Sequence, residues 1–106
     1  MNTLFICSRN QWRSPTAERI FAQEYGLQTR SAGTSRHAKH TLSVRDIAWA
    51  EQIFVMEPRH KQQIKEKFSK QLLHKKVFVL DIPDDYHYMD PALIELLKLA
   101  MQPYLK

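Results

Sequence analysis

The chain of 106 residues contains one cysteine, Cys7, and only two glycines, and it has no long hydrophobic run. A single cysteine excludes an internal disulfide framework and suits a reducing compartment, so we expect a cytoplasmic protein. The apolar run near the N-terminus, residues 4–6, is too short for the core of a signal peptide, and we expect no membrane association. The length suits a single domain spanning residues 1–106.

Acidic residues are outnumbered by lysine and arginine, 11 to 16, which gives a formal net charge of +5. Many of the lysines fall between residues 61 and 76. Such a run usually covers the solvent-facing side of a helix, which is the interpretation we favour over attraction of anionic partners. A nucleic-acid-binding surface would interleave aromatic side chains for base stacking. Only Phe68 lies in this stretch, so we do not expect a nucleic-acid partner.

Strand-forming and helix-forming segments alternate along the chain. Short apolar segments predict strands at residues 2–6, 27–32, 52–56 and 77–80. Helical periodicity and helix-start residues predict helices at residues 15–25, at 41–51, from 58 and from 91. This alternation predicts an α/β fold, with a four-stranded parallel sheet and helices on both faces. Ligands of such sheets bind beyond the carboxyl ends of the strands, where we expect Cys7, Thr34, Glu57 and Asp81.

The stretch from Cys7 to Pro15 joins the first strand to the first helix. The amide hydrogens of such a loop and the helix N-terminus favour negative charge at one point. We place Cys7 at the floor of this loop, where the positive field favours the reactive thiolate. Arg13 offers a planar fork for two oxygens of a tetrahedral anion, and Ser14 offers a hydroxyl to the sulfur. These residues predict an anion-binding loop with a nucleophile; an inert buried cysteine is the alternative.

Four motifs carry a resemblance to a known family. They are Cys7-x5-Arg13-Ser14 with Asn10 in the loop, SAGT at residues 31–34, IFVME at 53–57 and DIPDDY at 81–86. With these motifs in this order, nearly the whole chain resembles the low-molecular-weight protein tyrosine phosphatases. The resemblance implies a phosphatase that hydrolyses phosphomonoesters, in particular phosphotyrosine in proteins or a small aryl phosphate, through a cysteinyl-phosphate intermediate. It implies no cofactor, and the sequence shows no metal-ligand spacing.

The resemblance also assigns roles within the loop. Cys7 attacks phosphorus, while Arg13 and the loop amides hold the phosphoryl oxygens. Asn10 ties the loop down in a left-handed conformation, which asparagine tolerates, and Ser31 is a second candidate for bracing it. The residues expected to bind substrate are Ser8, Arg9, Asn10, Gln11, Trp12, Ser14 and Tyr86.

A general acid must protonate the leaving group, and three aspartates follow the fourth predicted strand. In the family the acid follows Ile-Pro, and matching Ile82-Pro83 places it at Asp84. This chain has Asp84-Asp85 where the family has Asp-Pro, and matching the strand end instead favours Asp81. We favour Asp84, with Asp85 or Asp81 as the neighbouring carboxylate.

The sequence departs from the family at three points. Trp12 stands where many members have a second cysteine, so we expect no protection of the nucleophile by a disulfide. For Trp12 we favour a core position behind the loop over a place in the pocket wall. Arg9 replaces a common glycine on the loop rim. The connector at residues 35–40 is short, which predicts a shallower slot and less strict phosphotyrosine selectivity, with Tyr86 or Tyr88 as an aromatic wall.

Two other functions fit the same loop. An arsenate reductase would need an external thiol, because Cys7 is the only cysteine. A phosphate- or phosphopeptide-binding module with weak catalysis would keep the loop without turnover. The presence of Cys7, Arg13 and a candidate acid favours the phosphatase over both.

Overall fold

The computed structural model describes residues 1–105, which contain one four-stranded sheet. All its strands pair in parallel, in the order β2-β1-β3-β4. Their bounds are β1 (Asn2–Cys7), β2 (Gln28–Gly33), β3 (Gln52–Val55) and β4 (Lys76–Val79). The predicted four-stranded parallel sheet is therefore confirmed.

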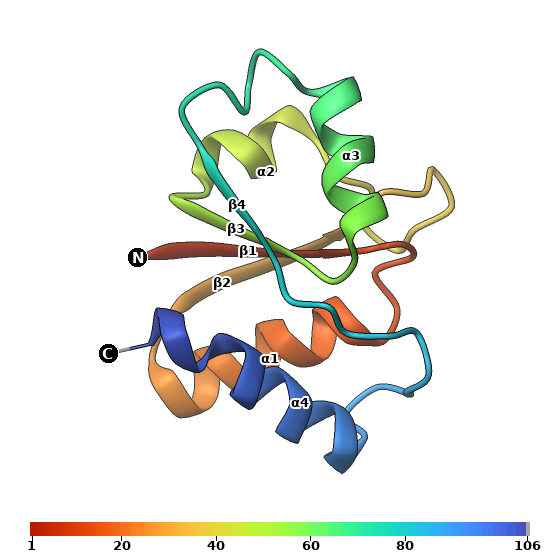
Figure 1. Ribbon diagram of the computed structural model, residues 1–106, viewed down its shortest axis with the longest axis vertical. Helices are drawn as coiled ribbons and strands as arrows, with labels where there is room; N and C mark the ends of the chain where they lie inside the picture. The colour runs from red at the N-terminus through yellow and green to blue at the C-terminus, as the bar shows by residue number, and fades with distance from the viewer. Residues whose placement is uncertain (106) are drawn as a thin grey trace.

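Helices cover both faces of the sheet, as predicted (Figure 1). On one face lie α1 (Arg13–Tyr25) and α4 (Pro91–Met101), and a 3-10 turn, η1 (Gln102–Tyr104), follows α4. On the other face lie α2 (Val44–Trp49) and α3 (Pro58–Lys67). No helix of residues 1–105 is both long enough and apolar enough to cross a membrane.

The predicted bounds of α2 are wrong, since the helix begins at Val44 and not at Thr41. Ser43 caps it: the Ser43 hydroxyl accepts from the amide of Asp46, and the Asp46 carboxylate accepts from the amide of Ser43. This reciprocal cap starts the helix one residue after Ser43. Thr41 instead forms an isolated parallel bridge with Gly33, at the end of β2.

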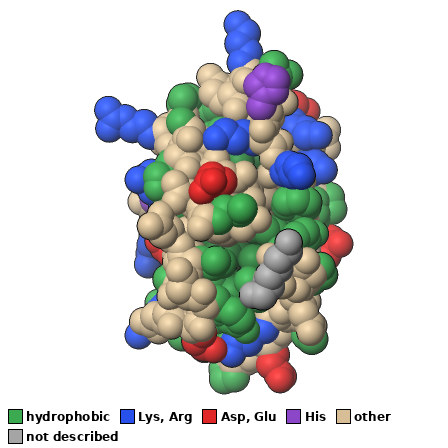
Figure 2. Space-filling view, turned by 90° about the vertical axis from the view of Figure 1, so that its left-hand side faces the viewer, with side chains coloured by type: hydrophobic (Ala, Val, Ile, Leu, Met, Phe, Trp, Pro, Cys, Tyr) green, Lys and Arg blue, Asp and Glu red, His purple; other side chains and the backbone are tan. Residues whose placement is uncertain are grey.

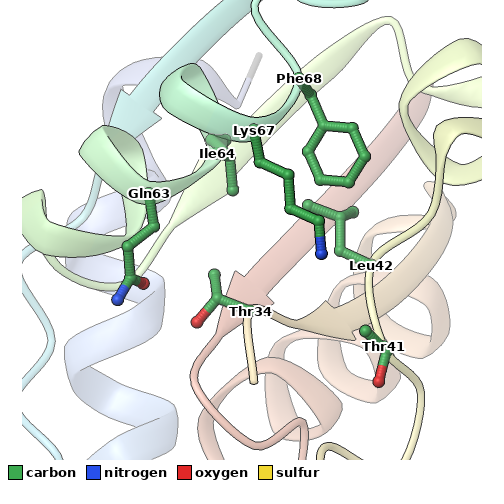
Figure 3. A pocket seen from close by; sticks show the side chains of 7 residues that line it. All are labelled: Thr34, Thr41, Leu42, Gln63, Ile64, Lys67 and Phe68. Atoms are coloured by element: carbon green, nitrogen blue, oxygen red, sulfur yellow. The ribbon is translucent and has the colours of Figure 1, made fainter. Parts of the chain in front are cut away.

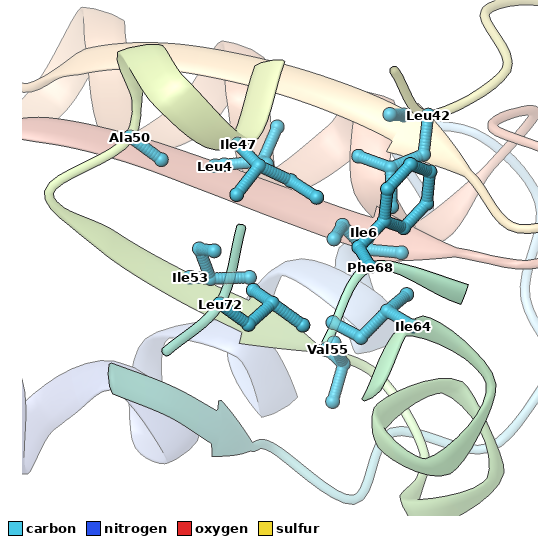
Figure 4. Packing of buried hydrophobic residues seen from close by; sticks show 11 residues of the cluster. Leu4, Ile6, Leu42, Ile47, Ala50, Ile53, Val55, Ile64, Phe68 and Leu72 are labelled. Atoms are coloured by element: carbon cyan, nitrogen blue, oxygen red, sulfur yellow. The ribbon is translucent and has the colours of Figure 1, made fainter. Parts of the chain in front are cut away.

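The central strands are buried on both faces because successive side chains point to opposite sides of a sheet. From β1 and β3, Leu4, Ile6, Ile53 and Val55 pack with residues of α2 and α3 (Figure 4). The alternate residues Phe5, Phe54 and Met56 pack against α1 and α4. Four rings, of Phe21, Phe5, Phe54 and Phe78, stack in a row with neighbouring centroids 5.4 to 5.7 Å apart. This packing on both sides fixes the end of β1, where Cys7 lies.

The strand order places a topological switch between β1 and β3. In the sheet, β2 lies on one side of β1, whereas β3 and β4 lie on the other side of β1. In Figure 1 the segments that follow the strands lie towards the right, and both termini lie at the left. The crevice beyond such a switch is where open parallel sheets bind ligands. The segments after β1, β3 and β4 converge there.

Basic side chains also lie on the face of the molecule towards the amino ends of the strands. Figure 2 shows this face, with lysine and arginine side chains gathered in its upper half. The lysines of α3 belong to another part of the surface, since α3 lies towards the right in Figure 1 and Figure 2 shows the left-hand side. On this helix Lys65 and Lys67 are exposed. These lysines cover a solvent-facing helix surface, as the sequence indicated.

Gly33 lies against the segment that follows β1, and this contact generates a prediction. A Cβ atom at Gly33 would lie 2.5 Å from the Ser8 carbonyl oxygen, 2.5 Å from the Ala38 Cβ and 3.0 Å from the Asn10 amide nitrogen. Because two of these are backbone atoms, Gly33→Ala must displace the segment. We expect it to lower the free energy of unfolding by about 1–3 kcal/mol.

Gly26→Ala is the matched control. Gly26 ends α1 with φ 66°, and an added Cβ meets no atom within 4 Å. Left-handed strain should cost about 1 kcal/mol there, with no effect on the segment after β1. Urea unfolding gives the stabilities, and NMR amide shifts of residues 8–13 report the displacement. Unchanged shifts in Gly33→Ala would contradict the proposed contact.

Candidate active site

A small cavity of about 40 Å³ lies beyond the carboxyl end of β1. It brings the predicted nucleophile, the predicted arginine and one of the predicted acids together. Its lining residues are Cys7, Ser8, Arg9, Gln11, Trp12, Arg13 and Asp84. Asn10 and Ser14 are buried behind it, whereas Asp81 and Tyr86 do not line it.

Cys7 is the last residue of β1, and only 3% of it is exposed. Its Sγ lies 3.0 Å from the Oγ of Ser14, which belongs to the first turn of α1. The amide hydrogens at this helix start also favour a negative charge nearby. A hydroxyl donor and a helix N-terminus thus both serve a thiolate at this position.

A chain of hydrogen bonds orients the Ser14 hydroxyl. The Asn10 amide Nδ2 donates to Ser14 Oγ and to Ser31 Oγ, each at 2.9 Å. Ser31 in turn donates to the Glu18 carboxylate at 2.6 Å. Because Nδ2 can only donate, Ser14 Oγ accepts from it. The hydroxyl hydrogen of Ser14 can then point to Cys7 Sγ at 3.0 Å or to the Ala32 carbonyl oxygen at 3.4 Å, and Cys7 is the nearer of the two. Asn10 has φ 54°, so the expected left-handed conformation and the bracing by Ser31 are both present.

Arg13 is 2% exposed, and its Nη1 is hydrogen-bonded within the protein. Its Nη1 donates to Glu57 Oε2 at 2.5 Å and to the Ile82 carbonyl oxygen at 2.7 Å. Its Nε lies 3.6 Å from Asp84 Oδ1, which is an ion pair but too long for a hydrogen bond. Within residues 1–105, Nε and Nη2 donate no hydrogen bond. This is the pair of donors that a guanidinium uses to grip two oxygens of one anion.

Glu57 supplies the charge that balances Arg13. It lies two residues after the end of β3, at the N-cap of α3, and its carboxylate also accepts from Arg59 at 3.1 and 3.2 Å. Hydrogen bonds from Arg59, and then those from Arg13, lower the pKa of Glu57 from 4.5 to about 2, against the opposing effect of burial. The carboxylate is therefore ionised at neutral pH. Sequence reasoning placed Glu57 at this edge but gave it no role.

His60, in the first turn of α3, is fully buried and connects Glu57 to the cavity. Its Nδ1 accepts from the Glu57 amide at 3.1 Å, and its Nε2 lies 2.8 Å from Ser8 Oγ. Burial, followed by the charge of Arg13, lowers the pKa of His60 from 6.5 to about 4. Sequence reasoning missed this residue. The available signal was a histidine three residues after Glu57, at the position of a reciprocal helix cap.

The segment between β4 and α4 brings Asp84 to the cavity. Two hydrogen bonds hold this segment in place. The Ile82 carbonyl oxygen accepts from Arg13, and the Met89 amide donates to the Thr16 hydroxyl at 2.9 Å. Asp84 reaches the cavity with about half of its side chain exposed. Asp81 is exposed and has φ 57°, so it turns the chain out of β4 and lies away from the cavity lining.

Two aromatic residues lie elsewhere than expected. Trp12 lines the cavity and packs edge-on against His87, with ring centroids 4.7 Å apart. It belongs to neither buried cluster, so the favoured core position was wrong. Tyr86 packs partly buried against the cluster under α1 and α4, and does not form the predicted wall.

A larger cavity of about 160 Å³ lies between the segment after β2 and α3 (Figure 3). Its lining residues are Thr34, Thr41, Leu42, Gln63, Ile64, Lys67 and Phe68. Its lining holds no cysteine, histidine or carboxylate. The backbone of Thr34, whose amide donates to the Cys7 carbonyl oxygen at 2.9 Å, lies next to the nucleophile's strand end. The residues suited to chemistry are those of the smaller cavity.

Comparisons with known proteins agree with this geometry. The family model described as "Low molecular weight phosphotyrosine protein phosphatase" matches residues 2–73. A mutant of YwlE from Bacillus subtilis is 26% identical and has a TM-score of 0.70, covering 98% of this chain and 99% of that chain. YwlE arginine phosphatase from Geobacillus stearothermophilus is 25% identical, with a TM-score of 0.68 over 96% of this chain and 84% of that chain.

The tyrosine phosphatase Wzb from Escherichia coli K30, solved in complex with phosphate, is 21% identical. Its TM-score is 0.78, over 97% of this chain and 94% of that chain, which supports the fold. No curated protein matches the sequence.

Burial of neutral His60 predicts how stability depends on pH. The unfolded chain takes up a proton at His60 near pH 6.5, whereas the folded protein does so only near pH 4. Between these values the unfolded chain binds more protons, so the free energy of unfolding falls as the pH is lowered from 6.5 to 4. The loss should reach about 3 kcal/mol.

Urea unfolding over this pH range measures the effect. His60→Gln, which does not titrate, should show a smaller decrease than the wild type. His74→Gln, at an exposed histidine, is the matched control and should keep the wild-type slope. Equal slopes in the wild type and His60→Gln would show that His60 is not held neutral.

Proposed function

Because the chain belongs to the low molecular weight phosphotyrosine protein phosphatase family, we propose that it hydrolyses phosphotyrosine in proteins through a cysteinyl-phosphate intermediate. Membership of the family makes it a phosphatase, whose substrate is phosphorylated. One observation carries the covalent mechanism of this proposal. Cys7 and Arg13 line the same cavity, and Nε and Nη2 of Arg13 make no hydrogen bond within residues 1–105.

In the first step, the Cys7 thiolate attacks phosphorus in line with the leaving oxygen. The S–P bond forms and the P–O bond to the phenol breaks, while Arg13 and the loop amides hold the three equatorial oxygens. Ser14 donates a hydrogen bond to the Cys7 sulfur, which stabilises the thiolate before it attacks. Asp84, in protonated form, gives its proton to the phenolate oxygen.

In the second step, Asp84 takes a proton from a water molecule that attacks phosphorus. The S–P bond breaks, inorganic phosphate forms and the thiolate returns. The same carboxyl group therefore acts first as acid and then as base.

Hydrolysis of p-nitrophenyl phosphate tests the nucleophile. Cys7→Ser should lose roughly a thousandfold or more in kcat, because serine lacks a comparable nucleophile, while it still binds phosphate. Equal turnover by the two proteins would refute the covalent mechanism. Phosphate binding by the wild type without any turnover would favour the binding module over the enzyme.

The acid is tested by comparing two asparagine variants. Asp84→Asn should lower kcat roughly 100-fold or more, because no carboxyl group then protonates the leaving oxygen. Asp81→Asn should keep the wild-type kcat, because Asp81 lies away from the cavity lining. The opposite pattern, with the larger loss at Asp81, would transfer the role to that residue. Asp84 lies beyond the residues matched by the family model, so this test is independent of the comparison.

Hydrolysis of phosphoarginine is a second candidate function. Two of the similar structures carry the name YwlE arginine phosphatase, at 25% and 26% identity. The cavity is also small and has Asp84 in its lining, and Tyr86 does not line it, so Trp12 is its one aromatic lining residue within residues 1–105. The guanidinium group of a leaving arginine is cationic, and the Asp84 carboxylate in the cavity lining is a group that attracts it.

Matched peptides decide between the two candidates. We expect kcat/KM to be highest for the phosphotyrosine peptide and lowest for the phosphoserine peptide, whose phosphate is on a shorter side chain. A higher kcat/KM for the phosphoarginine peptide would transfer the assignment to the second candidate. Inorganic phosphate release measures all three.

A further inference from the structure

Ser8 and His60 form a hydrogen-bonded pair that the two steps above do not use. Ser8 directly follows the nucleophile and lines the cavity. Its Oγ lies 2.8 Å from Nε2 of His60, which reaches it from the first turn of α3 and is fully buried. The pair therefore connects the cavity lining, at Ser8, to the first turn of α3, at His60.

The geometry fixes which ring nitrogen of His60 carries the proton. The Glu57 amide can only donate, and it points to Nδ1 at 3.1 Å. Nδ1 must then present a lone pair, and in the neutral ring Nε2 carries the hydrogen. His60 thus donates to Ser8 and cannot act as its base. A serine nucleophile activated by histidine is excluded.

The direction of this bond determines what Ser8 can do. Its oxygen accepts from His60, so the one hydroxyl hydrogen is left for another acceptor. Within residues 1–105, no other side-chain hydrogen bond of Ser8 occurs, and the residue is only partly buried. The space next to it is the cavity over Cys7.

We infer that Ser8 donates its hydroxyl hydrogen to the phosphoryl group bound over Cys7, and that His60 is the positioning residue that orients this hydroxyl. The inference deepens the proposed function and rests on it. The hydroxyl adds a side-chain donor to Arg13 and the loop amides. A hydrogen bond to a charged acceptor is stronger than one between neutral groups, so its loss should be measurable in oxyanion binding.

Inhibition by orthovanadate, a tetrahedral oxyanion, tests this in the full chain. Ser8→Ala should raise the inhibition constant about tenfold, whereas Ser8→Thr, which keeps a hydroxyl, should stay near the wild type. Ser69→Ala, at an exposed serine, controls for the substitution itself. Melting temperatures confirm that each variant folds.

His60 is tested with two substitutions, each of which replaces one of the two ring nitrogens by an amide group. His60→Gln places an amide N–H near the position of Nε2 and should keep most of the affinity. His60→Asn keeps an acceptor for the Glu57 amide but has no group near Nε2, and should weaken inhibition roughly threefold to tenfold. In the Ser8→Ala background, His60→Asn should have no further effect, since it acts through the serine hydroxyl.

Each outcome decides the proposal. An unchanged inhibition constant in Ser8→Ala, with normal turnover by the wild type, would overturn the inference and leave the phosphatase intact. An equal loss from His60→Asn with and without the Ser8 hydroxyl would show that His60 acts on the fold and not through Ser8. No inhibition and no turnover in the wild type would overturn both proposals. If His60→Asn does not fold, the comparison of Ser8→Ala with Ser8→Thr still decides the role of the hydroxyl.

Discussion

The buried guanidinium of Arg13 joins three segments at the carboxyl edge of the sheet. Arg13 ends the loop after β1, and its Nη1 donates to Glu57 after β3 and to the Ile82 carbonyl oxygen after β4. A buried charge is destabilising unless it is paired and hydrogen-bonded, and Glu57 supplies the pairing charge. Arg59 and Arg13 in turn hold the pKa of Glu57 at about 2. The ion pair thus fixes one edge of the guanidinium and leaves Nε and Nη2 for an anion.

The order of the strands makes this ion pair possible. Because β1 and β3 are neighbours at the switch in the sheet, the residues that follow them emerge side by side. The loop itself is shaped by two local constraints. Asn10 adopts a left-handed conformation and donates to Ser14 and Ser31. Gly33 allows the loop backbone to approach β2 more closely than any side chain would permit. Together they set the position of the hydroxyl that serves Cys7.

Much of the site follows from the sequence because its parts are local. The spacing from Cys7 to Arg13 and the conformation of Asn10 lie within one loop, and the helix start, predicted at Pro15 and observed at Arg13, follows at its end. The roles of Glu57 and His60 were not predicted, because they depend on which strand lies next to β1, and strand periodicity does not encode strand order. Trp12 and Tyr86 were misplaced for a related reason: whether an aromatic side chain packs in the core depends on the segment between β4 and α4, whose path is set by contacts distant in sequence.

A crystal structure with orthovanadate bound is the most direct test of this account. It should show vanadium bonded to Cys7 Sγ and two equatorial oxygens held by Nε and Nη2 of Arg13, with Nη1 still on Glu57. An oxyanion bound away from Cys7, or an Arg13 that leaves Glu57 to reach it, would contradict the view that the buried ion pair pre-forms the site.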